Sequence, residues 1–229
     1  MNFDTFEPVY EAILADFGFD RSADEHARDI AAEYATPFPL ARLGEWDGRT
    51  VAIAGAAPSL SEEVAIAREA DVVVAASTAV DELADVGVPV DCMVTDLDKN
   101  PATARTLTKQ GTPVVAHAHG DNVPAVREWL PQFVAEWTLV TTQAAPRGPV
   151  VNTGGFTDGD RAAFLADHLG AGRLVFPGWD FDDPTVGAMK AQKLEWAARL
   201  LRWLERRRDE EFAVLDGHRD VIDSAVDRL

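Results

Sequence analysis

The chain has 229 residues, of which 47% are hydrophobic, so it is long enough for one domain with a proper core and a small appendage. Its net charge of −18 argues against a nucleic-acid partner, because a phosphate backbone needs a basic face. The sequence has no apolar stretch of membrane-spanning length and no basic segment leading into an apolar one. We therefore expect a cytoplasmic protein with no membrane partner.

The basic residues are unusual in kind. Only four of the 21 are lysines, namely Lys99, Lys109, Lys190 and Lys193. An acidic, lysine-poor and alanine-rich chain suggests a halophilic protein, because high cytoplasmic salt screens self-repulsion. An ordinary acidic protein with a codon bias toward arginine and alanine stays open. The single Cys92 excludes an internal disulfide, and its apolar surroundings indicate a buried structural thiol.

Residues 1–47 are predicted to be helical. Phe6, Tyr10, Ile13 and Phe17 follow the spacing of an amphipathic face. A second helix is predicted from residue 22 to about residue 35, where Thr-Pro-Phe-Pro stops it. We expect this segment to be a prefix packed on the main domain, without a catalytic role of its own.

From residue 48 to residue 209, short apolar strands alternate with amphipathic helices. The predicted strands are residues 50–54, 72–76, 90–94, 114–117, 138–141 and 174–177. The predicted helices are residues 62–69, 81–85, 102–110, 123–133, 159–169 and 187–208. This alternation predicts an α/β fold, a mostly parallel Rossmann-like sheet with helices on both faces. The charged segment 210–229 is expected to pack weakly or to pair with another subunit, which would make a homo-oligomer.

Two carboxylates follow the third predicted strand. Asp96 and Asp98 come directly after the apolar run 90–94, and residues two apart in a strand point the same way. Open α/β sheets hold ligands at the carboxyl ends of their strands. Two convergent carboxylates there favour Mg²⁺, which commonly brings phosphates.

The loops after the first two strands are rich in small and hydroxyl residues. Gly55-Ala56-Ala57-Pro58-Ser59 can present backbone N–H groups and a helix N-terminus to an anion, although Ser59 is also a good helix cap. The loop contains neither Gly-x-Gly-x-x-Gly nor a Walker A pattern. Ser77 and Thr78 can meet a ligand or cap the next helix.

The fourth strand is followed by His117-Ala118-His119-Gly120-Asp121-Asn122. Such residues serve as metal ligands, acid–base groups or phosphate contacts. No third nitrogen or sulfur ligand accompanies the histidines, which argues against a zinc site.

The densest cluster is Gly154-Gly155-Phe156-Thr157-Asp158-Gly159-Asp160-Arg161. The glycine pair permits close backbone approach to a ligand, Thr157 and Asp158 can cap the following helix, and Arg161 can contact a phosphate. After the sixth strand, Trp179 can stack on a flat ring and Asp180 can accept hydrogen bonds from a heterocycle.

Taken together, segments 55–60, 94–98, 117–122 and 154–161 resemble the archaeal 6-hydroxymethyl-7,8-dihydropterin diphosphokinase family, over about residues 49 to 208. The resemblance implies Mg²⁺- and ATP-dependent transfer of a diphosphoryl group to the pterin hydroxymethyl, with release of AMP, in tetrahydromethanopterin or folate biosynthesis. The family's catalytic domain is similar to that of thiamin diphosphokinase. The chain departs from the family pattern at Ala57, at Ser77-Thr78, at Lys99 and at Thr153.

On this resemblance, Asp96 and Asp98 hold the Mg²⁺ that bridges the triphosphate, Asp121 is a third ligand or the base, and Arg161 neutralises charge on the bridging oxygen. The residues expected to contact ATP or its phosphates are Gly55, Pro58, Ser59, His117, His119, Asn122, Gly154, Gly155, Thr157 and Asp158. The residues expected to contact the pterin are Ser77, Thr78, Trp179 and Asp180. Three other readings stay open: thiamin diphosphokinase, a metal-dependent phosphohydrolase and a non-catalytic nucleotide-binding module.

Overall fold

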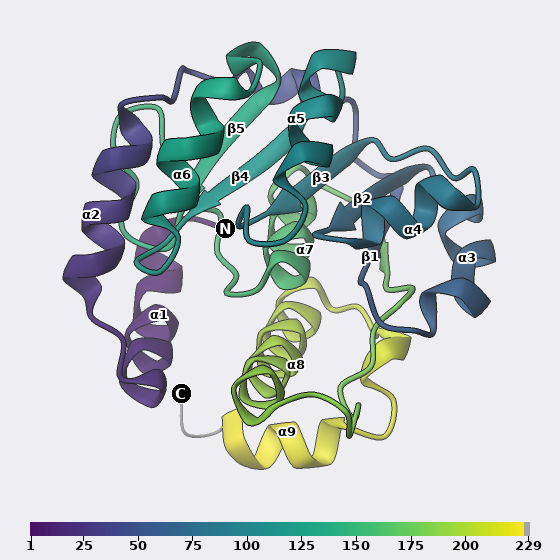
Figure 1. Ribbon diagram of the computed structural model, residues 1–229. Helices are drawn as coiled ribbons and strands as arrows, with labels where there is room; N and C mark the ends of the chain where they lie inside the picture. Colours follow the sequence, from purple (N-terminus) through teal and green to yellow (C-terminus); the bar gives the residue numbers. More distant parts are fainter. Residues whose placement is uncertain (227–229) are drawn as a thin grey trace.

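The computed structural model describes residues 1–226 and contains a six-stranded parallel sheet (Figure 1). Its strands are β1 (Thr50–Ala54), β2 (Val72–Ala76), β3 (Cys92–Thr95), β4 (Val114–Ala118), β5 (Thr138–Thr142) and β6 (Arg173–Val175). They lie in the order β5-β4-β3-β2-β1-β6, and every neighbouring pair is parallel. The predicted parallel α/β sheet is confirmed.

The helices of the described chain flank the sheet. They are α1 (Phe3–Phe17), α2 (Arg21–Ala32), α3 (Leu60–Glu69), α4 (Ala79–Asp85), α5 (Pro101–Gln110), α6 (Val123–Trp129), α7 (Asp158–His168), α8 (Ala188–Arg208) and α9 (Arg219–Val226). Short 3₁₀ turns occur at Leu40–Leu43, Leu130–Gln132, Ala135–Trp137 and Ala213–Leu215. Helices α3 to α6 join successive strands from β1 to β5, and α7 leads from β5 back to β6 beside β1.

Alternation along the strands divides the core into two layers. Val51 and Ile53 of β1 pack in the layer that contains α1, α7 and α8, whereas Ala52 and Ala54 pack in the layer that contains α2 to α6. Helices α5 and α6 cover the near side of the sheet in Figure 1. Because both faces are covered, strands β1 to β4 are mostly apolar. Cys92 is fully buried in β3, as expected for a structural thiol.

The N-terminal helices pack on the sheet domain. Phe6, Tyr10 and Ile13 of α1 are completely buried, and α2 packs on α6 and on strands β4 and β5. Helix α2 begins at Arg21, one residue before the predicted start, because the Asp20 carboxylate accepts the N–H of Ser22 at 2.9 Å. The prefix therefore packs on the main domain as expected, and the division into domains remains a prediction.

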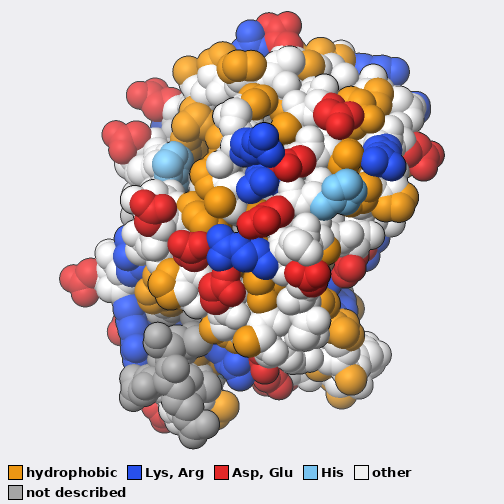
Figure 2. Space-filling model, turned by 90° about the vertical axis from the view of Figure 1, so that its left-hand side faces the viewer, with side chains coloured by type: hydrophobic (Ala, Val, Ile, Leu, Met, Phe, Trp, Pro, Cys, Tyr) orange, Lys and Arg blue, Asp and Glu red, His pale blue; other side chains and the backbone are white. Residues whose placement is uncertain are grey.

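The charged surface is mixed in sign on the face shown in Figure 2, where acidic and basic side chains are interspersed. Arg21, for example, pairs with three carboxylates from α1 and α2: Glu7 at 2.7 Å, Glu25 at 3.2 Å and Glu11. Within residues 1–226, no helix combines the length and the apolar character needed to cross a membrane.

The segment after α8 is packed more firmly than the sequence suggested. Phe212 and Leu215 are buried in the core. Glu205 of α8, only 2% exposed, accepts the N–H of Phe212 at 2.7 Å and pairs with Arg219 at 2.7 Å. The expectation of weak packing is thus wrong for residues 212–222, because Phe212, Leu215 and Ile222 are buried and the carboxylate of Glu205 requires its partners. Pairing with another subunit stays a prediction.

Candidate active site

A cavity of about 710 Å³ lies at the carboxyl edge of the sheet. Its walls come from the loops after the strands and from the starts of α7 and α8, and α1 and α2 close one end. The sheet order reverses between β1 and β6, the kind of switch point at which open α/β sheets bind ligands. The volume lies within the range of small-molecule sites.

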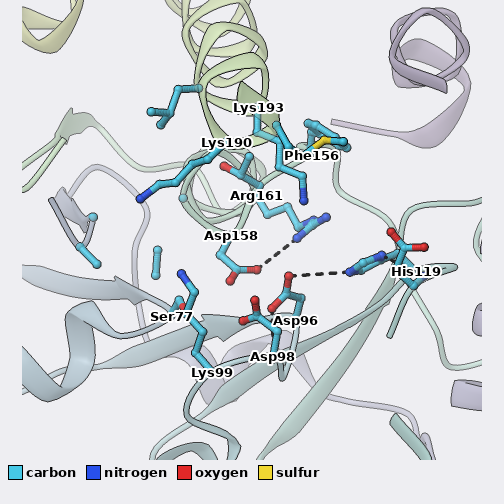
Figure 3. Close-up of a pocket in the computed structure, with 18 of the residues that line it drawn as sticks. Ser77, Asp96, Asp98, Lys99, His119, Phe156, Asp158, Arg161, Lys190 and Lys193 are labelled. Carbon is cyan, nitrogen blue, oxygen red and sulfur yellow. Dashed lines mark hydrogen bonds and ion pairs between the residues drawn. The ribbon is translucent and has the colours of Figure 1, made fainter. Parts of the chain in front are cut away.

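Asp96 and Asp98 face each other in this cavity (Figure 3), but the strand alternation is not the reason. Strand β3 ends at Thr95, and Leu97 adopts a left-handed conformation with φ of 68°. The side chain of Leu97 is 2% exposed, and its N–H is bound by the Thr95 hydroxyl at 3.0 Å. Burial of Leu97 thus stabilises a strained turn that directs both carboxylates into the cavity.

A third carboxylate, Asp158 at the start of α7, faces this pair (Figure 3). Its side chain is 11% exposed, and burial, together with repulsion from Asp96, raises the pKa of Asp158 to about 8 despite the nearby Arg161. Burial and the proximity of Asp96 raise the pKa of Asp98 to about 6. Burial opposes ionisation of Asp96 too, but its interactions with the nearby His119 and Asp98 outweigh burial and hold the pKa of Asp96 well below its ordinary range. This crowding of acids favours a bound cation.

The donor set fits Mg²⁺ carried by a phosphate ligand. Within the described chain, no group of three or more His, Cys, Asp or Glu side chains is arranged to hold a metal ion alone. Mg²⁺ characteristically takes one or two carboxylates and completes its octahedron with substrate phosphates and water. Asp96 and Asp98 are the residues that could hold it. Asp121, predicted as a third ligand or base, is exposed at the cavity wall, and that role stays a prediction.

Arg161 is buried beside the carboxylates and is held at two points. Its Nη1 lies 3.1 Å from Oδ1 of Asp158, and its Nη2 donates to Oε1 of Gln143 at 2.9 Å. The Nε atom of Arg161 is buried without a hydrogen-bond partner among the described residues. Gln143, which the sequence did not single out, also lines the cavity and fixes this guanidinium.

The two histidines of the predicted cluster have different positions. His119 lines the cavity, with its Nε2 3.7 Å from Oδ2 of Asp96. His117 lies within β4, is 2% exposed, and has its ring nitrogens 2.9 Å from the Thr141 hydroxyl and 3.3 Å from Gln143 Oε1. Burial lowers the pKa of His117 well below its ordinary value, with a further contribution from the charge of Arg161. His117 therefore does not line the cavity as a phosphate contact would, and it orients Gln143 instead.

Asn122 and the glycine pair Gly154-Gly155 lie behind the cavity wall and support it. Asn122 is 7% exposed, and its amide donates to the carbonyl oxygens of Asp96 at 2.6 Å and His117 at 2.7 Å. Gly154 and Gly155 have φ of 95° and 94°, and a Cβ on Gly155 would lie 2.5 Å from the Cα of Arg161. These residues do not line the main cavity; they join two strand ends and let the loop pass close to α7.

At the start of α7, one of the two predicted helix caps is observed. Thr157 is the N-cap, and both Thr157 and Asp158 line the cavity. Asp160, rather than Asp158, completes the cap by accepting the N–H of Thr157 at 3.0 Å. Asp158 is therefore free to face Asp96 and Asp98.

The loop after β1 contacts the loop after β6. The N–H groups of Gly55 and Ala57 donate to the carbonyl oxygens of Pro177 and Gly178, both at 2.9 Å. A Cβ on Gly55 would lie 2.4 Å from the Gly178 oxygen. Gly55 and Pro58 line the cavity, but two of the loop's N–H donors are already used and are not free for a phosphate.

The residues expected at the pterin are distributed unevenly. Ser77 lines the cavity with its hydroxyl buried and unpartnered among the described residues, whereas Thr78 lies outside the lining as the N-cap of α4. Trp179 lines the cavity and donates its indole N–H to Ile53 O at 2.8 Å. Asp180 is an exposed part of the wall. Ser59, expected at the phosphates, occupies the N-cap position of α3 without a capping hydrogen bond from its side chain, and it lies outside the lining.

Three of the four lysines of the chain line this one cavity. Lys99 follows the carboxylate pair, and Lys190 and Lys193 come from the first turns of α8 (Figure 3). The Nζ of Lys193 lies 5.9 Å from the ring centroid of Phe156. The composition contained a signal for this site, because lysine is rare in a chain whose other cations are arginines.

The end of the cavity closed by α1 and α2 was not foreseen. Ile13, Leu14, Phe19 and Ala23 give it an apolar wall, and the carboxylate of Asp24 lies among them, 7% exposed. Burial raises the pKa of Asp24, against hydrogen bonds from Gly120 and Tyr10 and the charge of His119 that lower it. The prefix thus takes part in the site.

The chain matches the model of a protein family described as 6-hydroxymethylpterin diphosphokinase MptE-like, over residues 30–185. Three relatives are named 6-hydroxymethyl-7,8-dihydropterin pyrophosphokinase. The relative from Methanothermobacter thermautotrophicus is 40% identical over 219 residues, covering 87% of this chain and 94% of the relative. The relative from Pyrococcus furiosus is 36% identical over 90% of this chain and 95% of its own length. The relative from Methanocaldococcus jannaschii is 30% identical over 93% of this chain and 99% of its own length.

Proposed function

The chain belongs to the 6-hydroxymethylpterin diphosphokinase MptE-like family, and we propose that it transfers a diphosphoryl group from ATP to the hydroxymethyl of 6-hydroxymethyl-7,8-dihydropterin and releases AMP. The observation that carries this proposal is the meeting of Asp96, Asp98 and Asp158 with Arg161 in one cavity. Carboxylates for a metal beside buried positive charge are what phosphoryl-transfer chemistry requires. The pathway served would be tetrahydromethanopterin or folate biosynthesis.

In this reaction the pterin hydroxyl oxygen forms a bond to the β-phosphorus, and the bond from that phosphorus to the oxygen bridging the α- and β-phosphates breaks. AMP leaves with the bonding electrons, and the hydroxyl proton passes to a base or to water. In the loose transition state of such reactions the proton needs no strong base, so positioning and charge neutralisation dominate. Asp121 remains our proposed third ligand or base.

Mg²⁺, when bound with ATP, would supply charge neutralisation at the triphosphate, with Asp96 and Asp98 as its protein ligands. Arg161 would bind the bridging oxygen on which charge develops, and its place in the cavity lining beside Asp158 supports that role. Asp158 and Gln143 would hold this guanidinium in place before the substrate binds.

Lys99, Lys190 and Lys193 would bind the remaining phosphate oxygens. Their charges are the cationic complement to the carboxylates, and they come from the loop after β3 and from α8. A triphosphate with its metal needs both signs of charge around it, and these three lysines with Arg161 provide the positive part.

The test is AMP formation from ATP and Mg²⁺ by the purified protein with the pterin, with thiamin, and with neither. The proposal expects AMP only with the pterin. AMP with thiamin would identify a thiamin diphosphokinase, and free phosphate without a pterin would identify a phosphohydrolase. ATP binding with no AMP in any arm would indicate a non-catalytic nucleotide-binding module.

A further inference from the structure

A buried carboxylate that the phosphate chemistry does not use faces the cavity from α2. Asp24 is 7% exposed and lines the same cavity as Asp96 and Asp158. Its Oδ1 accepts the N–H of Gly120 at 2.8 Å, and its Oδ2 accepts the hydroxyl of Tyr10 at 2.9 Å. Each carboxylate oxygen has two lone-pair sites, so both oxygens retain an acceptor position.

The fold brings this carboxylate close to the loop after β4. A Cβ on Gly120 would lie 2.7 Å from the Cβ of Ala23, so glycine permits the loop to contact α2. With one donor on each oxygen, the plane of the Asp24 carboxylate is fixed. A fixed plane is what recognition of two adjacent donors on a ligand requires.

The wall around Asp24 suits a flat, largely apolar ring. Ile13, Leu14 and Phe19 line the cavity from α1 and the turn that follows it. Phe17 stacks on Phe19 with ring centroids 5.1 Å apart and an interplanar angle of 18°, which supports the wall from behind. An apolar pocket with one precisely placed polar group is typical of a heterocycle site.

On the premise of the proposed function, we propose that Asp24 recognises the pterin by accepting its two adjacent donors, the ring N3–H and the 2-amino group. These donors lie on the pyrimidine edge, and the 6-hydroxymethyl group lies at the other end of the bicyclic ring. A pterin bound in this way points its hydroxyl away from Asp24 and toward the carboxylates of Asp96 and Asp98.

His119 spans the distance between these two groups. It precedes Gly120, which contacts Asp24, and its Nε2 lies 3.7 Å from Oδ2 of Asp96. The loop after β4 therefore connects the pterin end of the cavity to the metal end. This arrangement leaves the opposite end, formed by the loops after β1 and β6, for the nucleotide, and so it replaces the pterin contacts expected of Trp179 and Asp180.

The variant Asp24→Asn tests the assignment with little disturbance of the fold. The amide oxygen can still accept the N–H of Gly120, and the amide nitrogen can donate to the Tyr10 hydroxyl oxygen. An amide cannot accept two donors from the ligand, so the KM for the pterin should rise about tenfold to a hundredfold while the KM for ATP stays within about twofold. Asp29→Asn is the matched control, because Asp29 lies on the same helix and pairs with Arg28 and Arg147 away from the cavity.

A second measurement begins with the wild-type protein, and this first comparison does not depend on a variant folding. Binding of 6-hydroxymethylpterin is compared, by calorimetry, with binding of the analogue that lacks the 2-amino group. The proposal expects the analogue to bind at least about tenfold more weakly to the wild type and expects Asp24→Asn to lose this preference.

The outcomes separate the two proposals. If the wild type forms AMP with the pterin but Asp24→Asn keeps the wild-type KM and preference, Asp24 is a structural residue only and the assignment is overturned. If Asp24→Asn has a lower melting temperature but an unchanged KM for the pterin, Asp24 is likewise a structural residue only. If the wild type forms no AMP with the pterin, the proposed function itself fails.

Discussion

Nη1 of Arg161 lies 3.1 Å from Oδ1 of Asp158, and this pair faces Asp96 and Asp98 across the cavity (Figure 3). The second terminal nitrogen of the guanidinium is bound by Gln143 at 2.9 Å, so two groups fix its plane before any ligand arrives. A preorganised cation of this kind stabilises charge that develops in a transition state without reorganising.

We therefore expect Arg161→Lys to lower kcat by roughly a hundredfold to a thousandfold, because a lysine cannot reach both Asp158 and Gln143 with a planar fork. Steady-state AMP formation measures this. The exposed Arg173, outside the cavity, provides the matched control Arg173→Lys, which should retain wild-type turnover. Equal activity of the two variants would remove Arg161 from the mechanism.

Asp96→Asn should lower turnover by several powers of ten while the protein stays folded, because the amide removes the charge of a proposed metal ligand. Thermal unfolding recorded beside the AMP assay separates loss of activity from loss of structure. Asp85→Asn, at the exposed end of α4, is the control. Near-normal activity of Asp96→Asn would refute the metal role.

Lys190→Gln and Lys193→Gln should each raise the KM for ATP roughly tenfold, since each removes a cation that we propose binds phosphate through a charge-assisted hydrogen bond. Lys109→Gln is a matched control, because Lys109 is the one lysine of the chain that does not line the cavity. If the KM for ATP is the same in all three variants, α8 does not contribute to phosphate binding.

The parallel α/β architecture could be predicted from the sequence because the apolar strand patterns, the amphipathic helix patterns and the loop residues all indicated the same fold. Predicted strands 50–54 and 72–76 have the observed bounds, since each is a largely apolar run that follows a polar residue and ends at a small-residue loop. The sequence also placed Asp96, His119 and Arg161 at one edge of the sheet, because each comes after a strand of the parallel sheet, and all three line the cavity.

The sequence alone did not show that His117 is buried while His119 lines the cavity, because this difference depends on where β4 ends. The strand extends to Ala118, one residue beyond the predicted end, so His117 points into the core and His119 lies beyond the last strand residue. The left-handed Leu97 had no sequence signal, because such a conformation in a bulky residue is stabilised only by its buried surroundings.

The sequence did not predict that α2 forms part of the cavity wall, because its contacts there are with residues far along the chain. Asp24 and Gly120 are 96 residues apart, and only the packing of α2 on β4 and α6 brings them together. Helical spacing places Asp24 on the buried face of α2 with Ala27 and Ala31, but it does not show which loop that face contacts.

Protonation of His117 should destabilise the protein in acid. Burial lowers the pKa of His117 in the folded state, whereas the unfolded chain binds a proton near pH 6.5. The unfolded state therefore holds more protons below that pH, and the stability that neutral His117 provides above it is lost as the pH falls, by up to about 1.4 kcal/mol per pH unit.

Denaturant unfolding between about pH 7.5 and about pH 5 measures this slope. His117→Gln, which stays neutral, should show a smaller fall in unfolding free energy across the same range. A variant whose slope equals that of the wild type would show that His117 does not titrate on unfolding.

The charge of −18 predicts that salt stabilises the fold. Between about 0.1 M and about 1 M KCl the Debye length falls from about 10 Å to about 3 Å, which screens repulsion among exposed carboxylates. The free energy of unfolding should therefore rise with KCl concentration. Equal stability in dilute buffer and in molar KCl would argue against a halophilic protein.

The most direct test of diphosphoryl transfer is the mass of the pterin product formed by the wild-type protein from ATP, Mg²⁺ and 6-hydroxymethyl-7,8-dihydropterin. We expect a pterin that has gained two phosphoryl groups, with one AMP formed for each product molecule. A pterin that has gained a single phosphoryl group with release of ADP, or an unchanged pterin beside free phosphate, would contradict this expectation.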